Sequence, residues 1–285
     1  MFIAGGFISF EFAHIAALAG VDCVIIDHGD RPLRELDPDL VELLVKRTEQ
    51  TGIRVHLVTT VTGVIRTETG LDIAVEAGRK PSTIGAALVV HVPDLEELNL
   101  DAANIASGPR GVTVTEDLQS TTNAEVYAAG DAADTPAMRL TPVAVFEGKV
   151  AASNMLTGTT TTPDYTAVPT TVFTTPELNR VCILEHEARD LDIAIDVGVG
   201  VDVDVPHNDT SGWYSNYRVR ETTASAKIII DRATDRILGA PLLGPGYAEL
   251  INIFGLAIKL GLTSRQLTSM TATYPSIGAD LGSML

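Results

Sequence analysis

The sequence has few lysines, only two cysteines and little basic charge to balance its acids. Of its 20 basic residues only five are lysine, and 37 acidic residues bring the formal net charge to −17 at pH 7. Such an acidic surface repels nucleic-acid phosphates, so we expect no nucleic-acid partner. The composition is typical of proteins from salt-loving organisms, where high salt screens self-repulsion, and equally of an ordinary acidic protein.

Long apolar runs are also missing. No apolar stretch reaches the roughly 20 residues that a membrane-spanning helix needs. Met1 is followed at once by apolar residues without a basic segment, so the sequence predicts no signal peptide. We expect a cytoplasmic protein with no membrane partner. A chain of 285 residues has material for about two domains.

The two cysteines lie far apart in the sequence. Cys23 and Cys182 each stand in an apolar stretch typical of a strand, and neither has a neighbour at metal-binding or redox spacing. We therefore predict two buried, unreactive thiols and no metal site.

The most informative stretch, residues 121–148, reads TTNAEVYAAGDAADTPAMRLTPVAVFEG. It predicts a short strand at Glu125–Ala129, a turn at Gly130-Asp131, and a helix with Thr141 as N-cap and Pro142 at its first position. A carboxylate there can accept hydrogen bonds from a polyol, and the free N–H groups of the helix start favour negative charge. An ordinary buried strand that ends at a Gly-Asp turn is the alternative.

The pattern T-x4-V-Y-A-x-G-D followed by L-T-P-x-A resembles the second flavin-binding motif of the FAD-dependent pyridine nucleotide–disulfide oxidoreductases. That family includes lipoamide dehydrogenase, glutathione reductase and mercuric reductase. The resemblance implies that Gly130 and Asp131 lie at the cofactor, with Asp131 on the ribityl chain of FAD. It also implies that the helix start at Thr141 and Pro142 faces the pyrimidine edge of the flavin.

The N-terminus predicts the β-α-β unit of a dinucleotide-binding domain. A strand ends by about Ala4, a helix follows, and a buried strand at Val21–Ile26 ends at Asp27. A carboxylate at Asp27 favours the free 2′-hydroxyl of NAD over the 2′-phosphate of NADP, although His28 and Arg31 lie nearby. The helix carries apolar residues at helical spacing, namely Ile8, Phe12, Ile15 and Leu18.

The glycine pattern of this unit departs from G-x-G-x-x-G. Ala4 takes the place of the first glycine, Gly6 that of the second and Ser9 that of the third. Ala4 argues against a tight first turn, whereas Ser9 is small enough for the helix to pack on the strand. We predict that Gly5, Gly6 and Ser9 lie at the nucleotide.

The stretch GGFISFEFAHIAALAG resembles the nicotinamide-nucleotide domain of the same family, which implies that Glu11 faces the cofactor; a solvated helix residue is the alternative. Gly78–Pro81 resembles the family's G-R-x-P signature. The leucine-rich context of that signature surrounds Leu88–Leu98 instead, with a few residues missing after His91. We therefore interpret Gly78–Pro81 as a hairpin turn.

Other elements follow from local signals. The sequence predicts further helices and strands and a low-complexity linker: a helix that starts at Asp37-Pro38-Asp39 and ends at Thr51, strands at Val55–Val58, Val61–Arg66 and Leu71–Glu76, a helix at Pro142–Leu156, the linker at Thr159–Thr162, a hairpin of Ala226–Asp231 with Ile237–Leu243, a helix at Ala248–Leu260, and a helix that starts at Thr263.

The C-terminal part also resembles the family. The segment Pro169–Glu177 reads PTTVFTTPE and resembles the opening of the family's interface domain. Tyr274-Pro275 stands where the family places an acid–base histidine, as in mercuric reductase-like members. The resemblance implies that Tyr274 reaches across a dimer interface toward the electron acceptor; a structural tyrosine is the alternative.

The sequence thus predicts an α/β Rossmann-like nucleotide-binding domain and an α+β interface or dimerisation domain. We assign residues 1–92 to NAD(P) binding, residues 93–162 to the second FAD-binding segment and linker, and residues 163–285 to the interface domain. By the resemblance, the family's first glycine fingerprint and its C-x4-C redox pair are absent, so a missing N-terminal FAD-binding segment or chain is a possible partner.

By the resemblance, we expect a homodimer in which hydride passes from NAD(P)H through FAD to a disulfide or similar acceptor. NAD is expected rather than NADP. With half a flavin site, FAD should bind weakly or not at all, and the chain alone should not reduce a disulfide. The alternative is a non-catalytic, dimerising and nucleotide-binding remnant.

Overall fold

The computed structural model describes residues 1–78, 80–90, 99–189 and 202–285. The chain divides into two compact units: unit 1 comprises Met1–His91 and Ala167–Leu285, and unit 2 comprises Val92–Thr166. The segments assigned to nucleotide binding and to the interface therefore both contribute to unit 1. The three domain boundaries given above stay a prediction. No helix among the described residues is long and apolar enough to cross a membrane.

The first half of unit 1 contains the predicted β-α-β unit. It comprises β1 (Phe2–Ile3), α1 (Phe7–Leu18), β2 (Val24–Ile26), α2 (Pro38–Gln50) and β3 (Arg54–His56). The strands are parallel in the order β1-β2-β3, and Phe2 also bridges to Val90 in parallel. Asp37 caps α2 as expected, because its carboxylate accepts hydrogen bonds from the N–H groups of Asp39 and Leu40.

Helix α1 forms where the sequence predicts it, but the apolar row that we identified lies on its exposed face. Its buried residues are Ser9, Phe10, Ala13 and His14. The row itself is exposed: Ile8 by 45%, Phe12 by 54%, Ile15 by 60% and Leu18 by 78%. Because α1 is apolar on nearly all sides, spacing alone could not decide which side packs on the sheet.

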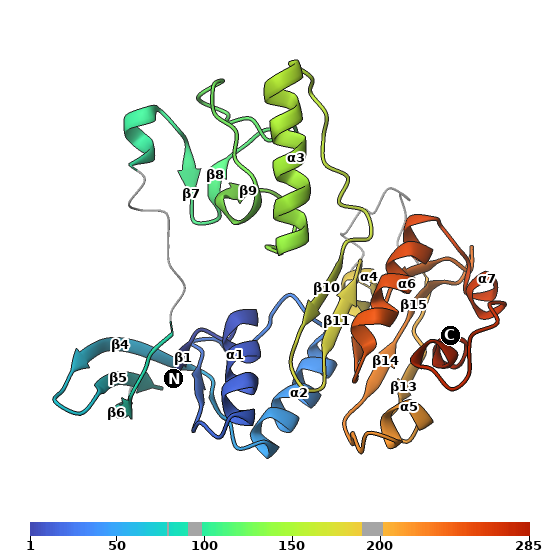
Figure 1. Ribbon diagram of the computed structural model, residues 1–285, viewed down its shortest axis with the longest axis horizontal. Coiled ribbons are helices and arrows are strands. Elements are labelled where there is room, and N and C mark those ends of the chain that lie inside the picture. Colours follow the sequence, from blue (N-terminus) through green and yellow to red (C-terminus); the bar gives the residue numbers. More distant parts are fainter. Residues whose placement is uncertain (79, 91–98, 190–201) are drawn as a thin grey trace. The chain divides into compact units, whose positions relative to one another are not determined.

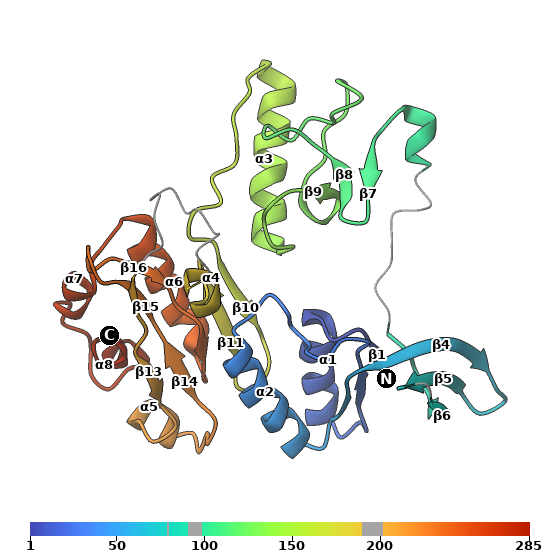
Figure 2. The ribbon, with the colours of Figure 1, turned by 180° about the vertical axis from the view of Figure 1, so that it is seen from behind.

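Three antiparallel strands follow: β4 (Thr59–Arg66), β5 (Leu71–Ala77) and β6 (Lys80–Ala86). They extend away from α2 in both views (Figures 1 and 2). Ala77 pairs with Lys80 and Gly78 has φ +53°, so the predicted hairpin turn is confirmed. Arg79 and the predicted shortening after His91 lie outside the described residues.

The second half of unit 1 is built on an antiparallel sheet in the order β10-β11-β17-β14-β13. Its strands are β10 (Pro169–Val172), β11 (Leu178–Val181), β13 (His207–Asp209), β14 (Ser225–Lys227) and β17 (Leu242–Leu243). A second sheet contains β12 (Val203–Asp204) and the hairpin of β15 (Ile229–Asp231) with β16 (Ile237–Gly239). The predicted hairpin is therefore present, but it is interrupted at Ile228 and at Ala240-Pro241.

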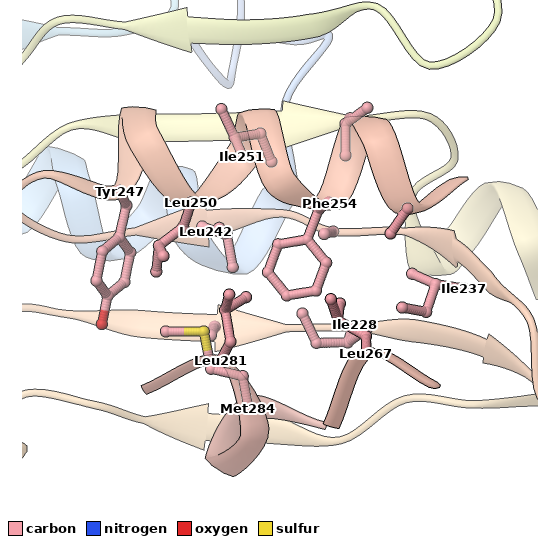
Figure 3. Close-up of a cluster of buried hydrophobic side chains, with 14 of the residues drawn as sticks. Ile228, Ile237, Leu242, Tyr247, Leu250, Ile251, Phe254, Leu267, Leu281 and Met284 are labelled. Atoms are coloured by element: carbon pink, nitrogen blue, oxygen red, sulfur yellow. The ribbon is translucent and has the colours of Figure 1, made fainter. Parts of the chain in front are cut away.

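Helix α6 (Tyr247–Lys259) covers the five-stranded sheet with its apolar side. Tyr247, Leu250 and Phe254 point toward the strands and toward the C-terminal helix α8 (Leu281–Met284) (Figure 3). The remaining short helices are α4 (Glu185–Arg189), α5 (Tyr214–Tyr217), η4 (Ile277–Asp280) and α7 (Ser264–Thr268). Helix α7 begins after Thr263 as predicted, with a complete capping box between Thr263 and Gln266.

The two halves of unit 1 share buried contacts. Val172, Leu178 and Leu243 belong to the same core cluster as Phe10 and Leu40. Buried ion pairs, described below, also join α2 to the second half. The predicted fold class is confirmed, since a parallel β-α-β unit is combined with a sheet-rich α+β domain.

Unit 2 consists of the small sheet β7 (Ser107–Gly108), β8 (Gly111–Thr113) and β9 (Ala133–Asp134), the turns η2 (Leu100–Ala103) and η3 (Gly130–Ala132), and helix α3 (Thr141–Thr157). The predicted strand at Glu125–Ala129 is wrong, because only Tyr127 makes a bridge, to Gln119. Asn123 bends the chain there: its side chain accepts from the Glu125 N–H and its carbonyl from the Val126 N–H. β8 pairs with β7 on one side, and on its other side with β9, which follows the Gly-Asp turn.

Helix α3 starts one residue earlier than predicted. Leu140 is the N-cap, Thr141 is the first helical residue and Pro142 the second, and no side chain caps the start. The Ala144 N–H donates to the Leu140 carbonyl at 2.9 Å, which sets this register. Gly158 ends the helix with φ +65°, as expected for a glycine C-cap.

Candidate functional site

The N-terminal glycine turn (Ala4, Gly5 and Gly6) joins β1 to α1. Ala4 has φ +76°, a conformation that alanine rarely adopts, and its N–H donates to the Ile26 carbonyl at 2.9 Å. The turn is therefore tight despite the alanine. Gly5 leaves no room for a side chain, since a Cβ there would lie 2.3 Å from Asp27 Oδ2. Gly6 is the exposed N-cap of α1 with no atom within 4 Å of a Cβ position, so the helix N-terminus is open to a ligand.

Asp27 lies against this turn, at the end of β2. It is 7% exposed, and its Oδ2 accepts from the Gly5 N–H at 3.1 Å while its Oδ1 accepts from the Gly29 N–H at 2.9 Å. His28 is exposed, with Nδ1 3.4 Å from Asp27 Oδ1. The structure thus brings Gly5, Gly6 and Asp27 together. Arg31 is turned into its own loop, where it donates to the Leu36 and Arg34 carbonyls, and Ser9 is buried on α1.

Glu11 contacts the second half of unit 1. Its Oε1 accepts a hydrogen bond from the Phe173 N–H at 2.9 Å, just after β10. A role at the cofactor stays a prediction for Glu11, because its side chain is only partly buried and one carboxylate oxygen is taken by Phe173.

His14 is a buried titratable group that the sequence did not single out. Its Nδ1 accepts from the Thr175 N–H at 3.2 Å, and its Nε2 lies 2.9 Å from Thr48 Oγ1. Because the Thr48 hydroxyl donates to the Leu44 carbonyl, its oxygen is left to accept from His14 Nε2–H, which fixes a neutral imidazole. Burial, followed by the charge of Arg47, lowers the pKa of His14 to about 4.

The Gly-Asp turn (Gly130 and Asp131) lies in unit 2, beside α3. Gly130 has φ +64°, and a Cβ there would lie 2.7 Å from Ala144 Cβ, so only glycine fits. Asp131 is exposed, and its carboxylate forms no hydrogen bond or ion pair with the described residues. Thr141 and Pro142 are exposed as well, at the uncapped start of α3. A free carboxylate and free helix N–H groups are therefore available to a polar ligand.

Behind this turn lies Glu147, which the sequence reading missed. It is fully buried, and its carboxylate accepts hydrogen bonds from the Gly130 N–H and from the hydroxyls of Thr135 and Tyr165. The sequence signal is an acidic residue that follows four apolar residues of a predicted helix, VAVFE.

Tyr274 is 75% exposed and lies in unit 1. Its ring centroid is 6.2 Å from that of Tyr214, with the two planes tilted by 34°. Tyr214 and Tyr217 on α5 are also exposed, by 53% and 74%. The structure therefore places Tyr274 in an exposed aromatic patch, which the sequence did not predict, and its role at an acceptor stays a prediction.

Both cysteines are free thiols. Cys23 is buried, Cys182 is half-buried, and burial raises the pKa of each thiol above its usual value. Among the described residues, no group of three or more His, Cys, Asp or Glu side chains could hold a metal ion.

Known proteins with similar sequences and structures agree with this arrangement. The chain is 31% identical over 286 residues to a mercuric reductase of Bacillus cereus. The match covers 98% of this chain and 43% of that protein. A dihydrolipoyl dehydrogenase of Geobacillus stearothermophilus is 27% identical and covers 97% of this chain and 57% of its own length. The chain thus spans about half the length of these curated relatives.

Among solved structures, the flavoprotein disulfide reductase RclA from Escherichia coli, as a Cu(II) complex, matches with a TM-score of 0.82 and 26% identity. The match covers 99% of this chain and 62% of RclA. Residues 1–148 match the family described as pyridine nucleotide-disulphide oxidoreductase, and residues 168–284 match its dimerisation domain. The chain therefore belongs to the pyridine nucleotide-disulphide oxidoreductase family.

Proposed function

We propose that this chain supplies the NAD(P)H site, one side of an FAD site and the interface domain of a flavin-dependent oxidoreductase. In such an enzyme, hydride passes from NAD(P)H through FAD to a disulfide or a similar acceptor. The observation that carries the proposal is the cluster of Gly5, Gly6 and Asp27 at the open N-terminus of α1. Relatives that span this chain are named as reductases and dehydrogenases.

The N-terminal glycine turn fits a dinucleotide. Gly6 leaves the first N–H groups of α1 open to a pyrophosphate, which the positive end of the helix dipole favours. The carboxylate of Asp27 is fixed by two backbone N–H groups, so it can accept hydrogen bonds from ribose hydroxyls without moving. A 2′-phosphate at the same place would meet a buried negative charge, so NAD is preferred to NADP.

The Gly-Asp turn fits the ribityl side of a flavin. Asp131 would accept hydrogen bonds from the ribityl hydroxyls, and the N–H groups of Thr141 and Val143 would face the electron-rich edge of the ring. Bound FAD supplies two-electron transfer between nicotinamide and acceptor. Because the family's first glycine fingerprint, which by the resemblance would hold the FAD pyrophosphate, is not found in this sequence, we propose weak FAD binding or none by the chain alone.

The acceptor is not a disulfide of this chain. Thiol–disulfide exchange requires a thiolate in contact with its partner sulfur, whereas Cys23 and Cys182 are free and their pKa values are raised by burial. We therefore propose that the isolated chain does not reduce a disulfide.

Titration of the purified chain with NADH and with NADPH tests the nucleotide site. We expect tighter binding of NADH, and Asp27→Ala should narrow the preference by about 1–2 kcal/mol. Asp30→Ala, which removes an acid from the same loop that is 91% exposed and lies 4.0 Å from Arg34, is the matched control and should leave the preference unchanged. Tighter binding of NADPH by the unmutated chain would show that His28 and Arg31 decide the choice.

We also propose that the chain forms a homodimer through its C-terminal domain, residues 168–284. The match to a dimerisation domain and the exposed aromatic residues Tyr214, Tyr217 and Tyr274 support this proposal. Light scattering at micromolar concentration in high salt should give twice the chain mass of 30.2 kDa. A monomer mass under these conditions would contradict it.

A second candidate is a non-catalytic, nucleotide-binding and dimerising protein. The observation in its favour is the pair of separate, free cysteines with raised pKa values. Flavin absorbance distinguishes the two candidates. Uptake of FAD, even when it is weak and seen only with FAD added in excess, would support the oxidoreductase and count against the non-catalytic candidate.

A further inference from the structure

Glu147 is a carboxylate that the proposed mechanism does not use, and it lies at the centre of unit 2. It belongs to α3 and is 0% exposed. Its Oε2 accepts from the Gly130 N–H at 2.6 Å, and its Oε1 accepts from Tyr165 Oη at 2.7 Å and from Thr135 Oγ1 at 3.0 Å. In the part of the chain that the structure describes, no basic side chain pairs with it.

A buried carboxylate without a cation is costly unless hydrogen bonds satisfy it. Here three neutral donors converge on its two oxygens, from the Gly-Asp turn, from the segment after β9 and from the end of unit 2. Tyr165 is affected in turn: burial, then its hydrogen bond to Glu147 and the charge of Glu147, raise the pKa of the phenol well above its usual value. The cluster is therefore a specific, fully satisfied arrangement.

Two side chains on one face of α3 hold Gly130 in place. Ala144 and Glu147 are three residues apart, so both side chains lie on one face of the helix. Ala144 fills the space where a Cβ of residue 130 would lie, and Glu147 holds the Gly130 N–H. These two contacts maintain Gly130 in its left-handed conformation at φ +64°.

Asp131 follows directly in the chain. Its own carboxylate is exposed and has no partner in the described residues, so only the backbone of the turn directs it. A change in φ or ψ at Gly130 would therefore redirect the Asp131 side chain, because no partner of that side chain holds it in place.

We propose that Glu147 is the positioning residue of the Gly-Asp turn: it holds the Gly130 N–H so that the Asp131 carboxylate points at the ligand, without touching the ligand itself. This inference deepens the proposed function, because the ligand of Asp131 is the flavin proposed above. The positioning role can be tested with and without that ligand.

The experiment compares Glu147→Gln, Glu147→Leu and a matched control, Asn154→Leu. The glutamine keeps an oxygen for the Gly130 N–H, while its amide NH2 can donate to the hydroxyl oxygens of Thr135 and Tyr165. The leucine removes every acceptor. Asn154 is another buried polar residue of α3, but it binds the carbonyls of Asp117 and Thr161 instead of the Gly-Asp turn.

Two quantities are measured for each variant. The first is hydrogen exchange of the Gly130 amide, resolved by NMR, which requires no ligand. The second is FAD affinity, from quenching of FAD fluorescence in the full chain. We expect Glu147→Leu to speed Gly130 exchange and to weaken FAD binding by about tenfold each, the effect of losing one buried hydrogen bond. Glu147→Gln should stay within about threefold of the unmutated chain.

Gly130 exchange that is unchanged in Glu147→Leu, or equally fast in Asn154→Leu, would overturn the proposal. If Glu147→Leu does not fold, Tyr165→Phe decides: loss of one anchor of the carboxylate should speed Gly130 exchange several-fold, and unchanged exchange overturns the proposal. If the unmutated chain binds no measurable FAD, as its incomplete flavin site allows, the exchange data alone decide the role of Glu147. If it binds FAD and Glu147→Leu binds equally well, Glu147 does not position Asp131.

Discussion

The N-terminal glycine turn and the Gly-Asp turn have the same parts, a left-handed residue, a carboxylate and a helix N-terminus, but they divide the work differently. At the first turn one residue, Asp27, both holds the turn through the Gly5 and Gly29 N–H groups and is expected to meet the ligand. At the second turn the holding is done by Glu147, and Asp131 is left free. A substitution of Asp27 should therefore change both the stability of the fold and ligand binding. At the Gly-Asp turn, a substitution of Asp131 should change ligand binding alone.

The surroundings differ as well. The N-terminal glycine turn belongs to unit 1, in which ion pairs join distant segments. At the Gly-Asp turn, by contrast, Glu147 accepts hydrogen bonds from neutral donors only. Lys227 of β14 is buried and contacts Asp37 at 3.3 Å, Glu185 at 3.2 Å and also Asp39. Burial would lower the pKa of Lys227, but its hydrogen bond to Asp39 and the charge of Asp37 outweigh burial and raise it. Lys227 is therefore charged and ties α2 to the second half of unit 1.

Removing this cation should have the largest effect on stability. Lys227→Met leaves the buried carboxylate of Asp37 without its ion pair and should lower the free energy of unfolding by about 3–5 kcal/mol. Urea unfolding measures the loss. Lys46→Met, which breaks an exposed pair with Glu42, should change stability by less than about 0.5 kcal/mol. A loss below about 1 kcal/mol in Lys227→Met would mean that the ion pairs do not fix the unit.

Asp27→Ala should give the next largest effect and should test the inseparability of the first turn. Two buried N–H groups, of Gly5 and Gly29, lose their acceptor, so unfolding free energy should fall by about 2–4 kcal/mol. NADH affinity, measured by titration, should fall in the same variant. If the stability is unchanged while NADH binding is lost, Asp27 contributes only to binding and the comparison fails.

Acid should lower the stability of unit 1 through His14. The pKa of His14 in the folded chain is lowered to about 4, below the 6.5 of the unfolded chain, so the unfolded state binds the proton first as pH falls. The neutral imidazole therefore contributes stability that is present above pH 6.5 and is lost between pH 6.5 and pH 4, by about 2–3 kcal/mol. Protonation of Nδ1 would also break the hydrogen bond from Thr175.

Urea unfolding at several pH values, for the unmutated chain and for His14→Gln, isolates this contribution from the titration of carboxylates. The difference between the two profiles should slope between pH 6.5 and pH 4 and be flat above that range. In hydrogen exchange, α1 should lose protection across this range in the unmutated chain but not in His14→Gln, and the two proteins should behave alike at α3. Equal losses at α3 and α1 would contradict a local effect of His14.

The smallest effect on stability is expected for Asp131→Ala. This exposed carboxylate has no partner in the described residues, so unfolding free energy should change by less than about 0.5 kcal/mol. Where the unmutated chain binds FAD measurably, its affinity for FAD should nevertheless fall by about tenfold, the loss of one charge-assisted hydrogen bond. A large loss of stability would show that Asp131 also holds the turn, and the two turns would then work alike.

Local signals in the sequence determined the ends of several elements. Asp37 and Pro38 start α2, Gly158 ends α3, and Thr263 with Gln266 starts α7. Each depends on hydrogen bonds or on φ values set within a few residues, which the sequence itself displays. The sequence also predicted the β-α-β unit that brings Gly5, Gly6 and Asp27 together, whereas the roles of these residues at a nucleotide, and of Asp131 at a flavin, stay predictions.

Contacts between distant residues decided the rest. The buried face of α1, the Thr175 partner of His14 and the ion pairs of Lys227 depend on residues up to 190 positions away in the chain. The strand predicted at Glu125–Ala129 did not form, because a strand needs a neighbouring ladder and β9 provides it instead. Likewise, the sequence pointed to Asp131, whose side chain is free. Only the fold brings the buried carboxylate of Glu147 onto the Gly130 N–H, and so the fold decides which acid holds the turn.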